Sequence, residues 1–492
     1  MKDICEYAKK GRKFFIYGTT IFAKYCCDKI CEKYGERAVT GFIESEKNDR
    51  VFDGGKPVLL PKEVAALYDD DTYFLIAGFK SFEAMRNNLR RLGVPAEHII
   101  RPEEYEPYFQ IGYPETIKRV CFWPEIEDAD TDVLTKIAWF IPDRITVDIF
   151  SGDNLTAKVR ENVLIHKKSY TNAVLCEADA ILLWDLSRER DVVERYPDKV
   201  RVVDKDFYLS IDAENYCRAY DASFSSEEKR VITDESKDRF EDMQKRAAVC
   251  RQANVFGSGP SIIEAEEFID EFRHDFNIIC NSMVKNKKLL SMLRPKLLTF
   301  ADICFFVSPS EYGKAFYSDL ITAQKEYGFH IIVRDCQKPL IAYHFPELGK
   351  CLIGIPYAYG DEWWLIDREH FYFKPMDNIM TDMMLPVATS LCDTVGIAGC
   401  TGRASAETYF WKHGDSVQYE DLKPAVFNMW RAFFHKRRYD AYFDSHCQHV
   451  DQWIRFGEKL GKKYVNYTTS FIPALRDRTV KVDGASRSVV DE

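Results

Sequence analysis

The chain has 492 residues, of which 46% are hydrophobic and 30% are charged. This length predicts several domains, and the hydrophobic content excludes a mainly disordered protein. Acidic residues outnumber basic ones, and the formal net charge of -10 excludes a broad basic face of the kind that binds nucleic acid.

The N-terminal sequence and the cysteines indicate in which cellular compartment the protein is expected. The N-terminal sequence MKDICEYAKKGRKFFIYG mixes lysines with acids and has no apolar run long enough for a signal peptide or a membrane span, and no later segment supplies one. The 15 cysteines are scattered without a C-x-x-C pair, which favours reduced thiols. We therefore expect a cytoplasmic protein without a transmembrane segment, either free or peripheral to the inner membrane.

Residues 1–112 alternate short apolar runs with amphipathic helical patterns, which predicts a Rossmann-like unit with a parallel sheet. The expected strands are KFFIYG, AVTGFIE, TYFLIAG and HIIRP, and the expected helices span Ile21–Tyr34 and Phe82–Leu92. Only Gly18 remains of a dinucleotide fingerprint, which disfavours a bound dinucleotide. In the order of its phrases IYG, GFIE, GKPVLLPKEV, YFLIAG and LRRLGVP, this segment resembles the nucleotide-sugar-binding-like N-domains found beside sugar-modifying enzymes.

Two clusters in this segment invite a metal interpretation, and both have simpler explanations. Cys26, Cys27 and Cys31 fit one helix, where thiols pack, and no histidine is near. Asp69–Asp71 come just before the strand TYFLIAG, where solvated turn carboxylates are expected. We predict no metal site in the chain.

Two further α/β units follow. A second Rossmann-like unit spans 113–224, with strands at RVCFWP, RITVDIF, AVLCEADAILLW and VRVVD and no catalytic constellation. Residues 225–252 place sparse apolar residues in a charged helical pattern, which predicts a helical linker. The third unit spans 253–475, with strands at ANVFG, FNIICNS, ICFFVSP, FHIIVRD, TVGIAGC and KYVNYT, and 476–492 are expected to form a flexible tail.

The third unit begins with the motif GSGPS, Gly257–Ser261, directly after an expected strand. Glycines allow close backbone approach, Pro260 suits a helix start, and the following IIEAEEFIDEF is expected to form that helix. Free backbone amides and a helix N-terminus attract phosphate. The motif alone leaves a phosphate cradle and a structural turn equally open.

Other expected strands of this unit also end in small polar residues. Asn281 and Ser282 follow FNIIC, and Ser308 and Ser310 close FFVSPS. Ligands gather at the carboxyl edge of doubly wound sheets, and these side chains suit a nucleotide held by hydrogen bonds better than they suit magnesium. The alternative is that they are helix caps and turn formers.

The order of these phrases resembles the bacterial sialyltransferases of glycosyltransferase family 42 and the related Maf-type flagellin glycosyltransferases. The resemblance covers the third unit and rests on VFGSGPS, CNS, FFVSPS, IMTDMMLPVATSL, VGIAGC and SHCQHVDQWIRFGEKLGKKYVNY. In that family a histidine stands five residues before an aspartate that opens a helix, and His446 precedes Asp451 by that spacing. Ser258 and Ser308 stand where the family has asparagine, and Asp382 where it has glycine, which bears on the donor more than on the fold.

The resemblance implies a sialyltransferase-like, doubly wound parallel sheet that transfers a CMP-activated nonulosonic acid, sialic acid or an analogue, to a glycan or protein hydroxyl with inversion. His446 is then the general base, since imidazole has suitable basicity, and Tyr409 and Tyr419 lie where family tyrosines steady the leaving phosphate. No obligatory metal or cofactor is implied. The implied nucleotide-sugar-binding residues are Gly257, Ser258, Gly259, Pro260, Ser261, Asn281, Ser282, Ser308 and Thr381.

Several alternatives stay open at this stage. His449 and His435 are rival bases, and the basic stretches HKKSY, KNKK and FHKRRY are either anion contacts or solvated loops. The G-x-G-P-S pattern also occurs in archaeal pterin diphosphokinase-like proteins, which need magnesium. A third interpretation is a non-catalytic nucleotide-sugar-binding protein. The sequence leaves the acceptor, the linkage, the role of the two N-terminal units and the oligomeric state, monomer or homo-oligomer, open.

Overall fold

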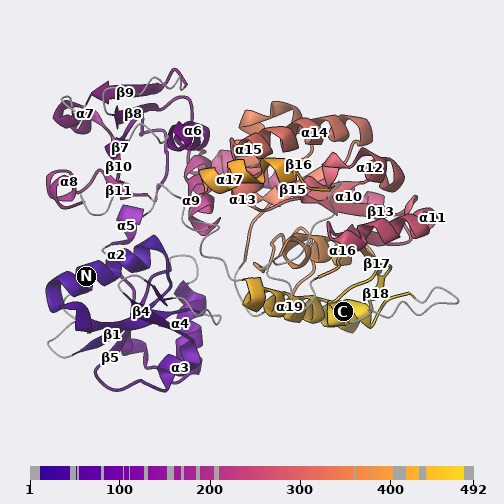
Figure 1. Ribbon diagram of the computed structural model, residues 1–492, viewed down its shortest axis with the longest axis horizontal. Coiled ribbons are helices and arrows are strands. Elements are labelled where there is room, and N and C mark those ends of the chain that lie inside the picture. Colours follow the sequence, from indigo (N-terminus) through magenta and orange to yellow (C-terminus); the bar gives the residue numbers. More distant parts are fainter. Residues whose placement is uncertain are drawn as a thin grey trace. The chain divides into compact units, whose positions relative to one another are not determined.

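The computed structural model describes residues 12–480 apart from 45–50, 53–54, 79–81, 104, 110, 127–130, 152–159, 168–170, 184–188, 204–209, 359–361, 377, 403–416 and 431–438. The chain divides into two compact units, Met1–Ala219 and Tyr220–Glu492 (Figure 1). Its fold is mixed α/β with three sheets of mainly parallel strands, which confirms the expected fold class at that level. No helix in the described ranges is long and apolar enough to cross a membrane.

The first sheet of the N-terminal unit has the strand order β3-β4-β2-β1-β5-β6, and only the short β3 is antiparallel. The expected helix Ile21–Tyr34 is confirmed as α2, and Thr20 caps it by accepting a hydrogen bond from the amide of Ala23. The strands are β1 Lys13–Tyr17, β2 Val39–Ile43, β3 Val51–Phe52, β4 Lys56–Leu59, β5 Thr72–Ile76 and β6 Ile99–Ile100. The other helices are α3 Pro61–Ala65, α4 Phe82–Arg91 and α5 Glu106–Phe109.

The second sheet has the order β11-β10-β7-β8-β9 and is parallel throughout. The stretch AVLCEADAILLW, expected as one strand, is divided, because Thr171–Glu177 form helix α7 before β10 Ala180–Leu183 begins. The remaining strands are β7 Arg119–Ile126, β8 Thr146–Ser151, β9 Val163–Lys167 and β11 Val200–Val202. The remaining helices are α6 Thr131–Phe140, α8 Glu189–Arg195 and α9 Ser210–Asp221.

The C-terminal unit contains a seven-stranded parallel sheet in the order β16-β15-β14-β13-β12-β17-β18. The inner strands β12 and β13 are buried along their whole length, which is why they read as mainly apolar runs in the sequence. The strands are β12 Ala253–Phe256, β13 Phe276–Cys280, β14 Leu297–Thr299, β15 His330–Arg334, β16 Leu352–Ile355, β17 Thr394–Ala398 and β18 Lys463–Asn466.

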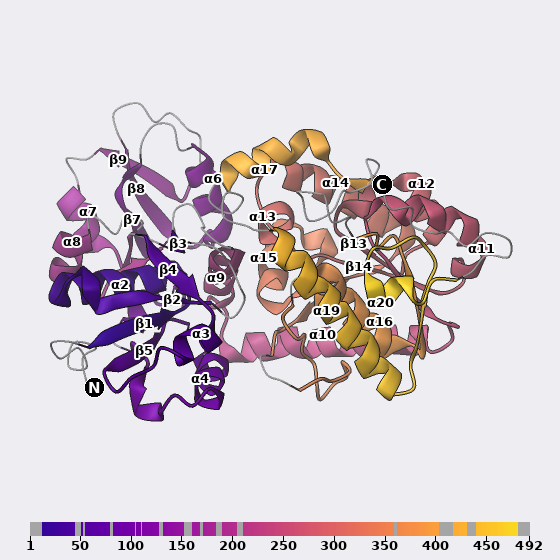
Figure 2. The ribbon, with the colours of Figure 1, turned by 60° about the horizontal axis from the view of Figure 1, so that its bottom comes forward.

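Helices cover both faces of this sheet. Figure 2 shows α10, α16 and α19 as neighbouring helices, and α16 contacts both of the others. The helices are α10 Ser226–Ala247, α11 Ile269–Phe272, α12 Lys287–Leu293, α13 Ile303–Phe306, α14 Glu311–Tyr327, α15 Lys338–His344, α16 Leu385–Leu391, α17 Lys423–Met429, α19 Tyr439–Lys459 and α20 Pro473–Arg476. A π-helical turn, Met380–Met384, leads directly into α16.

Three further segments, all in the C-terminal unit, differ in part from their expected structure. Most of the segment 225–252 forms α10, whose Phe240, Met243 and Ala247 are buried within the C-terminal unit, so its sparse apolar residues still define a packing face. The stretch ICFFVSP is helix α13 rather than a strand, because Asp302 caps a helical turn there, and β14 lies a few residues earlier. The expected tail begins with an ordered segment, in which Arg478 pairs with Glu458; residues 481–492 lie outside the described residues.

Candidate functional site

The strand order reverses at one place in the C-terminal sheet. From β12 the chain steps outward through β13, β14 and β15 to β16, then crosses back through α16 to place β17 and β18 on the other side of β12. The motif Gly257–Ser261 follows β12, and the loop Gly399–Gly402 follows β17. Ligands of doubly wound sheets bind beside the carboxyl ends of the strands at such a reversal, so this edge is the candidate site.

The backbone amides of the GSGPS motif are used by the neighbouring loop. The amide of Gly257 donates to Ala398 O at 2.8 Å and that of Gly259 to Gly399 O at 2.9 Å. The amide of Ser261 donates to Thr401 Oγ1 at 3.0 Å. Three of the amides that a phosphate cradle would offer are therefore already hydrogen-bonded within the chain.

The two glycines are explained by this close approach of the two loops. A Cβ on Gly257 would lie 2.7 Å from Cys400 Sγ, and one on Gly259 would lie 2.5 Å from Thr401 Oγ1. Both distances are far shorter than real contacts, so any side chain would force the loops apart. The glycines thus serve the packing of the loop after β12 on the loop after β17.

Pro260 begins a 3₁₀ helix, Pro260–Phe268, and the expected α-helix is limited to the single short turn of α11. Within this segment Glu264 Oε2 accepts hydrogen bonds from the amide of Thr469 at 2.9 Å and from its hydroxyl at 3.1 Å. That contact holds the 3₁₀ helix against the loop that follows β18. A 3₁₀ helix with one short α-helical turn behind it has a smaller dipole than the expected α-helix, so it attracts a phosphate less strongly.

Buried hydroxyl groups join the loops after β12, β17 and β18. Ser258 and Ser261 are both buried. Ser261 Oγ lies 2.7 Å from Thr401 Oγ1, and Thr468 Oγ1 accepts a hydrogen bond from the amide of Gly399 at 2.8 Å. Burial also raises the pKa of the adjacent Cys400 thiol to about 12, so this thiol stays protonated at neutral pH.

Asn281 opens a 3₁₀ turn, Asn281–Lys285, directly after β13. Its φ of 51° lies in the left-handed region, which residues other than glycine seldom adopt. Backbone conformations of this kind cluster at binding and catalytic sites, and Asn281 lies on the candidate edge. The expectation that Asn281 follows the second strand of the unit is confirmed.

Ser282 and Ser308 hold a later segment of the chain, Val417–Trp430, which we call the arm. Ser282 Oγ lies 2.7 Å from Val417 O and 2.9 Å from Gln418 Oε1. Ser308 Oγ accepts a hydrogen bond from the indole of Trp430 at 3.1 Å. Ser308 follows α13 rather than a strand, and Ser310 caps α14 by accepting from the amide of Gly313 at 3.1 Å.

Tyr419 belongs to the same arm, and its hydroxyl donates to Asp319 Oδ2 at 2.6 Å. Its ring packs edge-on against Tyr312 at a centroid distance of 5.2 Å. Burial and the neighbouring Asp319 carboxylate raise the pKa of Tyr419 well above its usual value. These contacts make Tyr419 an anchor of the arm on α14, while Tyr409 lies outside the described residues.

Thr381 lies inside the π-helical turn and is fully buried. Its hydroxyl donates to Asn378 O at 3.1 Å. The next residue, Asp382, accepts hydrogen bonds from the amide of Met376 at 3.1 Å and from the hydroxyl of Tyr357. π-Helical turns are often retained at functional sites, and α19 contacts this one.

His446 lies within α19, which begins at Tyr439, and its side chain is 0% exposed. The expected helix start at Asp451 is wrong, because Asp451 is in mid-helix and pairs with Arg455 at 2.6 Å across one turn. His449 is half-buried on the same helix, and His435 lies outside the described residues. Of the two described histidines of α19, His449 is the more accessible.

The basic stretches are largely paired where the structure describes them. Lys288 of KNKK bonds Glu266 at 2.8 Å, and Lys285 donates to Gln418 O at 2.6 Å. His166 of HKKSY lies 2.6 Å from the buried carboxylate of Asp148. Most of FHKRRY lies outside the described residues.

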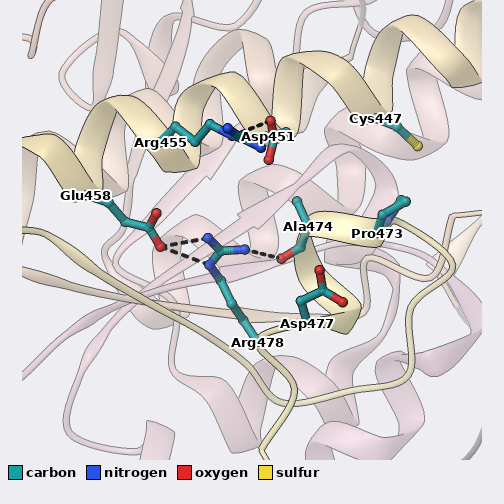
Figure 3. A pocket seen from close by; sticks show the side chains of 8 residues that line it. All are labelled: Cys447, Asp451, Arg455, Glu458, Pro473, Ala474, Asp477 and Arg478. Carbon is teal, nitrogen blue, oxygen red and sulfur yellow. Dashed lines mark hydrogen bonds and ion pairs between the residues drawn. The ribbon is translucent and has the colours of Figure 1, made fainter.

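A cavity of about 450 Å³ lies between α19 and α20 (Figure 3). Its walls carry the ion pair of Arg455 with Asp451 and that of Arg478 with Glu458. The spacing of three of these residues, Asp451, Arg455 and Glu458, places them on one face of a helix, and this spacing could have been recognised in the sequence. The lining residues are Cys447, Asp451, Arg455, Glu458, Pro473, Ala474, Asp477 and Arg478.

No group of three or more residues suited to bind a metal ion occurs among the described residues. The Asp69–Asp71 turn is exposed, and Asp69 pairs with Lys13 at 2.9 Å. Cys27 and Cys31 face each other on α2 with their sulfur atoms 3.9 Å apart. Burial raises the pKa of the Cys27 thiol to about 12, which disfavours the thiolate that a metal requires.

Comparisons of this chain with protein-family models, with curated proteins and with solved structures give no match.

Proposed function

We propose that the C-terminal unit binds a nucleotide-activated sugar at the carboxyl edge of its sheet and acts as an inverting glycosyltransferase. The observation that carries the proposal is the position of Gly257–Ser261 and Gly399–Gly402 on β12 and β17, the two strands between which the order reverses. The resemblance to family 42 sialyltransferases names the donor class, a CMP-activated nonulosonic acid, and the acceptor as a glycan or protein hydroxyl.

The polar groups in the loops nearest the strand reversal favour metal-independent transfer over phosphoryl transfer. The loops after β12, β13 and β17 present serine, asparagine and threonine, whereas a pterin diphosphokinase-like enzyme requires carboxylates that hold magnesium. A nucleotide phosphate leaves already ionised, so the transfer needs no strong general acid to protonate it. The reaction does need a general base that removes the proton of the acceptor hydroxyl. A non-catalytic sugar-binding protein remains the second candidate, and it requires no base on α19.

Two histidines of α19 are candidates for that base. The resemblance assigns the role to His446, since that residue has the spacing to Asp451, whereas exposure favours His449. An imidazole accepts the acceptor hydroxyl proton in the transition state, and the base must lie within hydrogen-bond reach of that proton. Because His446 is buried, its use requires that substrates open a path to the imidazole.

Ligand binding tests the proposal first. Thermal unfolding and calorimetry with CMP, UDP, ADP and S-adenosylmethionine, each with and without magnesium, measure which nucleotide stabilises the protein. We expect selective stabilisation by CMP that does not depend on magnesium. Stabilisation by ADP that requires magnesium would instead support phosphoryl transfer, and stabilisation by none of the four ligands would refute nucleotide binding.

The base is identified by parallel substitution of the two histidines. With a CMP-nonulosonic acid as donor, replacement of the true base by glutamine should lower turnover by roughly 100-fold to 10,000-fold and leave CMP affinity unchanged. His370→Gln is the matched control, because the His370 side chain is 59% exposed on the loop between β16 and the π-helical turn. Full turnover in both His446→Gln and His449→Gln would exclude a histidine base on α19.

A further inference from the structure

The arm Val417–Trp430 makes its most concentrated polar contact through Gln418, which is 6% exposed. Three donor groups lie around the side-chain oxygen of this residue, and one of them, the Ser282 hydroxyl, shares its single proton with Val417 O. Ser282 Oγ lies 2.9 Å away, the amide of Tyr419 lies 3.2 Å away, and the hydroxyl of Tyr312 also donates to it. Three donors around one buried oxygen are more than an amide oxygen usually accepts.

A positive charge completes this donor set. Lys285 Nζ donates to the backbone oxygen of Gln418 at 2.6 Å and lies 5.3 Å from the centre of the Tyr419 ring. Two hydroxyl groups and an ammonium group therefore meet at one residue. Ser282 and Tyr312 are themselves buried, with 2% and 0% of their surface exposed.

The groups that donate to Gln418 lie at the candidate edge of the sheet, whereas Gln418 itself comes from a later part of the chain. Ser282 and Lys285 lie in the turn after β13, and Tyr312 lies in the first turn of α14. Gln418 is far away in sequence and is brought there by the arm, whose helix α17 lies against α14 (Figure 2). The arm thus supplies an oxygen atom to donors that the sheet edge already positions.

We propose that Ser282, Lys285 and Tyr312 form a subsite for an anionic oxygen of the phosphate class, and that Gln418 fills this subsite as an internal competitor. The assignment of the anion to the donor phosphate rests on the proposed function. Hydrogen bonds to a charged acceptor are roughly twice as strong as those to a neutral one. A phosphate oxygen can therefore displace the amide oxygen of Gln418 from the same donors.

Three proteins test this competition, namely the wild type, Gln418→Ala and Gln418→Glu. The alanine variant leaves the donors without their acceptor, so the dissociation constants for CMP and inorganic phosphate should fall by about tenfold. The glutamate variant keeps an oxygen at this position and adds a charge that Lys285 attracts, so both ligands should bind more weakly than to the wild type. Gln324→Ala, on the far end of α14, is the matched control and should bind both ligands as the wild type does.

The outcomes separate this inference from the proposed function. CMP binding of equal strength in all four proteins overturns the internal competitor and leaves the proposed function standing. Tighter phosphate binding by Gln418→Ala without any CMP binding supports the subsite and overturns the proposed function. Absence of both ligands from all four proteins overturns both proposals.

Hydrogen exchange in the wild type provides a test that does not depend on the folding of the variants. Saturating inorganic phosphate should speed amide exchange in Val417–Trp430, because the displaced arm loses the contacts of Gln418. Exchange of the α15 peptide, Lys338–His344, serves as the internal reference and should not change. Slower or unchanged exchange in the arm while phosphate is bound would overturn the proposal.

Discussion

Lys338 provides the sharpest test of the electrostatics of the C-terminal unit. It lies at the start of α15, is 5% exposed, and donates to Ile232 O at 2.9 Å and to Ser236 Oγ at 2.8 Å on α10. Both acceptors are neutral. Burial and, after it, the nearby positive charge of Arg239 lower the pKa of Lys338 from 10.5 to about 8, while the Glu235 carboxylate opposes this shift.

The sign of the effect follows from the direction of this shift. Between pH 8 and pH 10.5 the unfolded chain holds a proton on Lys338 that the folded chain has released, so the free energy of unfolding rises with pH in this window. A shift of about 2.5 units at about 1.36 kcal/mol per unit gives a gain of about 3 kcal/mol. Below pH 8 the penalty for the buried charge is present in full.

Lys338→Met removes the titrating group and retains most of its volume. Ser236 Oγ still donates to Ile232 O at 2.9 Å in the absence of the lysine, so Ile232 O keeps a hydrogen-bond donor. The difference in unfolding free energy between wild type and variant should therefore change by about 3 kcal/mol in favour of the wild type from pH 8 to pH 10.5. Groups that titrate in both proteins cancel in this difference.

Urea unfolding of both proteins at four pH values across the window measures the difference. Lys314→Met is the control, because the Lys314 side chain is 64% exposed on α14 and its difference from wild type should vary by less than about 0.5 kcal/mol. A constant difference between wild type and Lys338→Met across the window would refute the reasoning, since Lys338 would then titrate alike in the folded and unfolded states.

Two further substitutions test the packing of the C-terminal sheet, one at the candidate edge and one near the amino end of β13. Gly259→Ala should lower the free energy of unfolding by about 1–3 kcal/mol, because the new Cβ would lie 2.5 Å from Thr401 Oγ1. Urea unfolding measures this free energy. An unchanged value would contradict the tight approach of the loops after β12 and β17. Asn277→Ala should lower the free energy of unfolding by about 3 kcal/mol, because Asn277 Nδ2 donates to Phe272 O and Leu293 O and its Oδ1 accepts from Asn254. In the same urea assay Asn286→Ala, which removes the cap of α12, should cost about 1 kcal/mol.

The sequence predicts the sheet of the C-terminal unit well where a strand is a bounded apolar run. ANVFG, FNIICNS, FHIIVRD, TVGIAGC and KYVNYT all contain strands of that sheet. The strand predicted at ICFFVSP is wrong, because a short buried apolar run has no periodicity that distinguishes a strand from a helical turn. The three-residue strand Leu297–Thr299 is too short to stand out beside it.

The candidate site was predictable in position but not in its contacts. Gly257–Ser261 and Asn281 lie at strand ends, as their place after apolar runs indicated. Nothing in the local sequence shows that the partner of Ser261 is Thr401 or that the partner of Ser282 is Gln418, since these pairs are more than a hundred residues apart. Contacts of that kind depend on the tertiary fold, which composition and periodicity do not specify.

The hydrogen bonds of the candidate edge change what its serines imply about a ligand. Ser261, Ser282 and Ser308 each bond to a distant segment of the chain, so packing alone accounts for their side chains. A ligand that binds Ser282 must replace hydrogen bonds that Ser282 already makes within the chain. Only the difference in free energy between the hydrogen bonds to the ligand and those within the chain contributes to affinity. If the donor binds at this edge, its affinity should therefore depend more strongly on Gln418, the group it displaces, than on the hydroxyl of Ser282, which is bonded in both states.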